Sequence, residues 1–210
     1  LTDPADYATL LAELDDTNGA TRIEFRKAMA AKAFAATASY DAAIAGWFAR
    51  SDQQFHFPPT RAVASKLATT LRYGENPHQQ AALYLPTFSS LGTGIPQAEQ
   101  VQGKELSYNN FNDANAALEL VAEFAGAAPT VVIVKHANPC GVATAPTLLE
   151  AWEAALACDS VSAFGGIVAT NVPLDGPPAE AFCQIFTEVV VAPGADDAAR
   201  AAFTKKKNLR

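Results

Sequence analysis

The sequence predicts an α/β protein in which a helical segment is followed by a layered domain. Residues 1–50 show helical periodicity only, whereas strand-like and helix-like segments alternate from about residue 98 onward. The strand-like segments are short, rich in β-branched residues and free of polar alternation. Strands of this kind are typical of a sheet that is covered on both faces. We therefore expect a layered α/β domain in the second part of the chain.

The helical segment predicts two helices. Thr2 is the expected N-cap of the first, and the spacing of its apolar residues places them on one helical face. These residues are Tyr7, Leu10, Leu11 and Leu14. The segment "TRIE" then has the spacing of a capping box with Thr21 as the cap, and an alanine-rich helix runs from it to about Trp47. Because this second helix carries no obvious chemistry, we expect it to serve in packing.

The segment "SDQQFHFPPT", residues 51–60, contains two prolines and marks the expected domain boundary. We assign residues 51–70 to a linker and domain entry, and residues 71–210 to the second domain. The strands expected after the prolines are "RAVASKLATTL", "AALYL", "TVVIV", "GIVAT" and "EVVVA". The expected helices are "FNDANAALELVAEFAG", "TLLEAWEAALACD", "PPAEAFCQIF" and "DDAARAAF".

Ligands in α/β sheets bind beyond the carboxyl ends of the strands. This rule directs attention to three loops, which follow Val134, Asp159 and Ala192. We expect the functional residues in or near these loops.

The composition excludes several classes of protein. With 50% hydrophobic and 18% charged residues the chain is globular rather than disordered, and a net charge of −7 argues against bulk binding to nucleic acid. No run approaches 18 uninterrupted apolar residues, which argues against a membrane protein. Three cysteines lie far apart in the sequence and do not suggest a disulfide framework, so a reducing cytoplasm is the expected location. They are Cys140, Cys158 and Cys183.

The segment "VIVKHANPCGVAT" places a lysine and a histidine directly after an apolar strand. If both reach a ligand, Lys135 supplies a fixed positive charge for an anion or a developing oxyanion. His136 can move a proton near neutral pH. A solvent-exposed lysine beside a structural histidine is the alternative that this pattern leaves open.

Cys140 raises two further alternatives, a zinc site and a cysteine nucleophile. Zinc deaminases carry H-x-E and P-C-x-x-C, but here Asn138 and Ala143 stand where the glutamate and the second thiolate are needed. We therefore expect no catalytic metal. A nucleophilic Cys140 with His136 as its base remains open. We favour a small buried thiol, with Pro139-Cys140-Gly141 shaping a turn.

Three other segments carry groups suited to ligands. "LRYGENPHQQAALY" joins an arginine, which suits phosphate or carboxylate, to Tyr73 and His78. "LSYNNFNDANAALEL" has more amides at a helix start than capping needs, which suggests recognition of a polar ring. "SVSAFGGIVAT" has paired glycines, which let a backbone approach a ligand closely. Ordinary loops and caps are the competing interpretation for each.

Five segments in register resemble a single family. "LRYGENPHQ", "FNDANAALEL", "VKHANPCGVA", "SAFGGIVA" and "EVVVAPG…KKKNLR" are similar to the bifunctional AICAR transformylase/IMP cyclohydrolases of purine biosynthesis. The resemblance covers essentially all 210 residues. It implies that residues 1–50 are the helical end of the cyclohydrolase domain and that residues 71–210 are the first part of the transformylase domain. The transformylase fold is similar to that of cytidine deaminase but has no catalytic metal.

The resemblance also implies an activity and its residues. A transformylase moves a formyl group from the cosubstrate 10-formyltetrahydrofolate to the amine of AICAR, and the cyclohydrolase closes the ring to IMP. The family's lysine–histidine pair falls on Lys135 and His136, and His78 falls on a histidine near that pair. The positions that line the nucleotide or folate site correspond to Arg72, Tyr73, Asn110, Phe164, Gly165 and Glu188.

The resemblance further implies a homodimer whose transformylase sites are built from both subunits. Since the sequence starts at Leu1 and ends in "KKKNLR", we expect a segment of a longer protein that is inactive by itself. The alternative function is a non-catalytic ligand-binding or dimerisation module with a degenerate deaminase-like fold. A cysteine-dependent acyl transferase is a third possibility.

Overall fold

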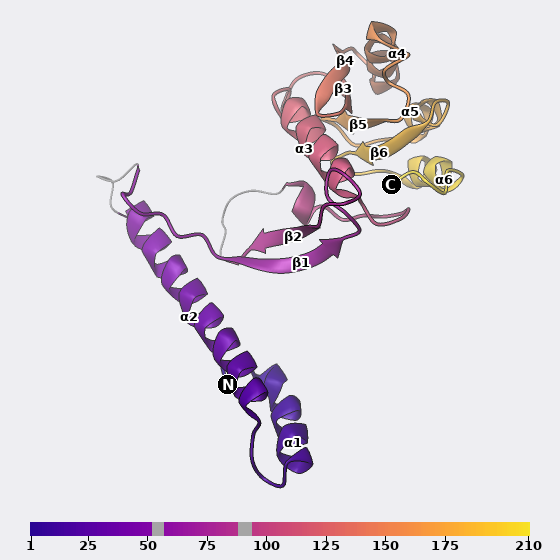
Figure 1. Ribbon diagram of the computed structural model, residues 1–210. Helices are drawn as coiled ribbons and strands as arrows, with labels where there is room; N and C mark the ends of the chain where they lie inside the picture. Colours follow the sequence, from indigo (N-terminus) through magenta and orange to yellow (C-terminus); the bar gives the residue numbers. More distant parts are fainter. Residues whose placement is uncertain (52–56, 88–93) are drawn as a thin grey trace. The chain divides into compact units, whose positions relative to one another are not determined.

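A computed structural model describes residues 1–51, 57–87 and 94–210 (Figure 1). It confirms the α/β class, with helices and two sheets. The chain divides into two compact units, Leu1–Ala68 with Tyr84–Ser90, and Thr69–Leu83 with Leu91–Arg210. The predicted assignment of residues 1–50, 51–70 and 71–210 to parts of two domains stays a prediction, as does the cytidine-deaminase-like layering. Residues 52–56 of the predicted linker lie outside the described residues.

Two α-helices make up most of the first unit. A short helix, η1 (Pro4–Asp6), leads into α1 (Tyr7–Asp16), and α2 (Ile23–Ser51) follows, so both predicted helices are confirmed. Figure 1 shows α1 beside the first turns of α2, and an ion pair joins Lys32 of α2 to Asp6 of η1. Among the described residues, no helix is both long and apolar enough to cross a membrane.

The caps of these helices differ from the predicted ones. Asp3 caps the first turn in place of Thr2, since its carboxylate accepts a hydrogen bond from the Ala5 N–H at 2.9 Å. The capping box at Thr21 is also wrong, because the Arg22 carbonyl accepts the first bond of α2. A shift of one residue changes the cap without changing the apolar periodicity, so the pattern does not resolve it.

Strands β1 (Ser65–Leu71) and β2 (Ala81–Pro86) form a two-stranded sheet, and both were predicted. The main sheet has four strands in the order β4-β3-β5-β6. Their bounds are Thr130–Lys135 for β3, Asn138–Thr144 for β4, Gly166–Thr170 for β5 and Thr187–Val191 for β6. Strand β3 is antiparallel to both of its neighbours, whereas β5 and β6 are parallel.

Helices cover both faces of this sheet, as the missing polar alternation predicted (Figure 1). One face packs on α3 (Tyr108–Ala122), which follows a short helix η2 (Ile95–Gln97). The other face packs on α4 (Leu148–Cys158), α5 (Gly176–Phe182) and α6 (Asp197–Thr204). Alternate residues of β3 serve the two layers: Val132 and Val134 face the α3 side, whereas Val131 and Ile133 face the opposite side.

The antiparallel course of β3 corrects the expected position of the ligand loops. Because β3 runs against β5 and β6, its carboxyl end lies beside their amino ends. The loop after Asp159 precedes β5 and therefore lies at the same end of the strands as Lys135. The loop after Ala192 follows β6 and lies at the opposite end of the strands, so it is not near Lys135.

The sequence predicts a turn at Pro139-Cys140-Gly141, and this prediction is wrong. The three residues are part of β4. Strand β4 is at the edge of the sheet, where a proline is tolerated, and the register shifts between Ile133 and Val134, opposite Gly141 and Pro139. Gly141 lets α4 approach closely, because an added Cβ would lie 2.0 Å from the Ala155 carbonyl oxygen.

Candidate functional site

The tip of the β3–β4 hairpin carries the predicted lysine–histidine pair. Lys135 pairs with Asn138, which leaves a loop of two residues, His136 and Ala137. Both have left-handed backbones, with φ of 52° and 56°. Two-residue hairpins of this form usually contain Asn-Gly, because positive φ is costly for residues with a Cβ. The turn is therefore one that its own two residues do not favour.

The Asp113 carboxylate of α3 binds both amides of this turn. Its Oδ2 accepts from the His136 N–H at 3.0 Å, and its Oδ1 accepts from the Ala137 N–H at 2.9 Å. The Asn138 side chain donates to the His136 carbonyl at 2.7 Å. All three contacts act on the backbone, and His136 is an exposed residue at the tip.

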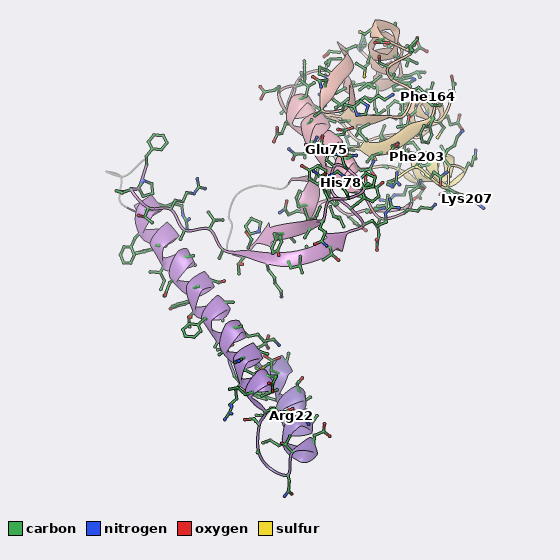
Figure 2. The ribbon with its side chains drawn as sticks, viewed as in Figure 1. Arg22, Glu75, His78, Phe164, Phe203 and Lys207 are labelled. Carbon is green, nitrogen blue, oxygen red and sulfur yellow. The ribbon has the colours of Figure 1, made fainter. Side chains whose placement is uncertain are left out.

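Lys135 contacts the loop that precedes β5. Its Nζ donates to the Phe164 carbonyl oxygen at 2.8 Å. Gly165 follows with φ of 77°, and its N–H donates to the Phe186 carbonyl at 2.7 Å. The ring centroids of Phe164 and Phe186 lie 5.5 Å apart. Phe164, labelled in Figure 2, is exposed. The structure thus brings together Lys135, His136, Phe164 and Gly165, which the sequence had singled out separately.

A second contact joins Asn110 of α3 to Glu188 of β6. The Asn110 Nδ2 donates to Glu188 Oε2 at 2.6 Å, and its Oδ1 accepts from the backbone N–H of Ser107, the N-cap of α3. Asn110 is 4% exposed. Arg210 lies 3.8 Å from the same Glu188 oxygen. Both predicted binding residues therefore have protein partners already, and capping accounts for one of the amides, as expected.

The loop between β1 and β2 carries the remaining candidates. The Arg72 guanidinium lies 5.5 Å from the centre of the Tyr73 ring. The Asn109 side chain of α3 donates to the Glu75 carbonyl at 3.3 Å, which attaches this loop to the helix. His78 is exposed on the same loop (Figure 2). Within the described residues no hydrogen bond joins His78 to the lysine–histidine pair, so its supporting role stays a prediction.

The start of α3 contacts three of these segments. Asn109 binds the β1–β2 loop, Asn110 binds β6, and Asp113 binds the hairpin tip. The sequence suggests that this polar cluster recognises a ligand, and it does not indicate that three of its members bind two neighbouring loops and strand β6. The excess of amides and a carboxylate at a helix start was the available signal, but the pattern does not identify their partners.

A family model described as "AICARFT/IMPCHase bienzyme" matches residues 1–210. The chain belongs to the AICARFT/IMPCHase bienzyme family. Proteins named "Bifunctional purine biosynthesis protein PurH" from Dinoroseobacter shibae, Ruegeria sp. and Brucella ovis are 59%, 57% and 56% identical to it. These alignments cover 99–100% of the chain but 38–39% of the relatives, so the chain spans about two fifths of their length. The resemblance found in the sequence is thereby confirmed.

The other two chemistries raised for the hairpin gain no support in this AICARFT/IMPCHase chain. Across residues 1–51, 57–87 and 94–210, no three His, Cys, Asp or Glu side chains are grouped so that they could hold a metal ion. Cys140 is a free, half-buried thiol whose pKa is raised, chiefly by burial and then by the nearby Asp159 carboxylate. A raised pKa reduces the thiolate fraction at neutral pH, which disfavours a nucleophilic role.

Cys140 is expected to react slowly with alkylating reagents. Because its thiol pKa is raised, the thiolate fraction at a given pH is smaller than for an ordinary thiol, and the alkylation rate should still be rising beyond the ordinary pKa of about 8.5. The exposed Cys158 is the internal reference at pH 7. Mass spectrometry of peptides after timed iodoacetamide treatment measures both rates. Faster labelling of Cys140 than of Cys158 at pH 7 would support the cysteine nucleophile instead.

Proposed function

We propose that the longer protein of which this chain is a part transfers a formyl group from 10-formyltetrahydrofolate to the amine of AICAR, within de novo purine biosynthesis. The observation that carries the proposal is the placement of Lys135 and His136 at a fixed hairpin tip beside Phe164. Membership of the AICARFT/IMPCHase family supports it. The relatives' name, "Bifunctional purine biosynthesis protein PurH", supports the pathway.

His136 is the proposed base. The amine of AICAR is a poor nucleophile, because its lone pair is conjugated with the carboxamide. As the amine nitrogen attacks the formyl carbon, the exposed His136 imidazole takes the proton that the nitrogen releases. The bond between the formyl carbon and the folate nitrogen then breaks, and a proton passes to that departing nitrogen. Holding the amine and the formyl group together is itself part of the catalysis.

Lys135 is the proposed electrostatic group. An ammonium has three N–H donors, and one of them donates to the Phe164 carbonyl at 2.8 Å. The other two can stabilise the negative charge that develops on the formyl oxygen, or one can protonate the departing folate nitrogen. The contact with Phe164 fixes the position of the ammonium before substrate binds.

Six residues are proposed to bind the nucleotide or the folate. Arg72 offers a planar cation for an anionic group, and Phe164 offers an exposed ring. The others are Tyr73, Asn110, Gly165 and Glu188. We further propose a homodimer in the cytoplasm, with transformylase sites shared between subunits, and a cyclohydrolase activity that resides largely in the part of the protein preceding this chain.

The test is to incubate the full-length protein with AICAR and 10-formyltetrahydrofolate and to follow tetrahydrofolate and the formylated nucleotide. We expect saturable turnover, and we expect the 210-residue chain alone to show neither formyl transfer nor ring closure. A full-length protein that shows neither turnover nor saturable binding of AICAR or a folate analogue would favour the alternative, a non-catalytic module.

A further inference from the structure

The two residues of the hairpin tip need an outside contact to keep their conformation. His136 and Ala137 both have positive φ, and neither is a glycine. Such backbones persist in proteins only where surrounding groups fix them, and they occur often at functional sites. The contact that fixes this tip comes from another part of the sequence, because Asp113 lies 23 residues before His136.

Asp113 makes two contacts that no neutral side chain of the same size reproduces. Each carboxylate oxygen accepts one amide, at 3.0 Å from His136 and at 2.9 Å from Ala137. Hydrogen bonds to an ionised acceptor are stronger than those between neutral groups. An asparagine has only one acceptor oxygen, so it can bind one of the two amides and must turn its NH₂ group toward the other.

The backbone is what determines the direction of the His136 side chain. In the described part of the chain, the imidazole makes no hydrogen bond, whereas the Lys135 ammonium is fixed directly by the Phe164 carbonyl. We propose that Asp113 is a positioning residue for formyl transfer, because it fixes the left-handed turn that aims His136 at the reacting amine. This inference rests on the proposed function.

Variants of the full-length protein test the inference. Asp113→Ala should lower kcat and kcat/KM for AICAR by the same factor, about 10- to 100-fold. A misplaced base stabilises the transition state less well, whereas substrate binding is unchanged. Asp113→Asn, which retains one acceptor, should give an intermediate kcat. Glu119→Gln removes an exposed carboxylate from the same helix and should leave kcat unchanged. Rates are expressed per AICAR-binding site, so a loss of folded protein does not count as a loss of kcat.

The outcomes separate the inference from the function on which it rests. A wild-type protein without formyl transfer overturns the proposed function. An active wild type in which both Asp113 variants keep the wild-type kcat per site, or change KM alone, overturns the positioning role. If Asp113→Ala does not fold, the near-isosteric Asp113→Asn decides the question alone.

Discussion

Lys135→Ala and His136→Ala in the full-length protein are each expected to lower kcat for formyl transfer by about 10²- to 10⁴-fold. His136→Ala removes the proposed base, which would take the proton of the amine. Lys135→Ala removes the positive charge proposed to stabilise the oxyanion, and it also removes the hydrogen bond to the Phe164 carbonyl. Steady-state kinetics with both substrates measure the loss, and KM for AICAR should change much less than kcat.

Two controls make this result specific to the hairpin tip. Lys27→Ala removes the same charge from an exposed position of α2 and should keep the wild-type kcat. Cys140→Ser should also remain active, because the cysteine is not the proposed nucleophile. Wild-type turnover in both Lys135→Ala and His136→Ala would remove the pair from the mechanism, and loss of turnover in Cys140→Ser would point to the cysteine.

Gly141→Ala is expected to destabilise the second compact unit by about 3 kcal/mol, at the upper end of the usual cost of overpacking. The added Cβ would lie 2.0 Å from the Ala155 carbonyl oxygen and 2.8 Å from the carbon of the same group. Neither atom can rotate away, because both belong to the backbone of α4. The helix must therefore move off strand β4, which opens the buried layer that contains Trp152.

Urea unfolding of the full-length protein, followed by circular dichroism, measures this loss. The matched control is Gly194→Ala, since an added Cβ at Gly194 meets no atom within 4 Å and its φ is not in the left-handed range. We expect this control to unfold like the wild type. Equal stability of the two variants would show that α4 and β4 are less closely packed than described.

The sequence predicts the elements of this fold better than it predicts their directions. The apolar runs at β3, β5 and β6 identify buried strands, and the helical periodicity identifies α3 and α4. The antiparallel hairpin could not be predicted, because His-Ala lacks the Asn-Gly signature of a two-residue turn. Pro139 made a strand look like a loop, since only its position at the sheet edge makes it acceptable there.

The candidate site was predictable in its residues but not in its contacts. Lys135 and His136 follow directly from the end of an apolar strand, and local pattern is sufficient to find them. The bonds from Asn110 to Glu188 and from Asp113 to the hairpin tip join residues 78 and 23–24 positions apart. Periodicity carries no information about such pairs, so the role of α3 emerged only from the three-dimensional arrangement.

The binding of the hairpin amides by α3 has a consequence for exchange with deuterated solvent. Amides at the tip of an exposed hairpin ordinarily exchange within the dead time of an experiment, because local fraying is nearly free. Those of His136 and Ala137 exchange only when the Asp113 contacts open. Protection of these two amides from exchange therefore shows that the first turns of α3 are folded. Slow exchange at the tip would indicate that the helix and the hairpin open together as one cooperative unit.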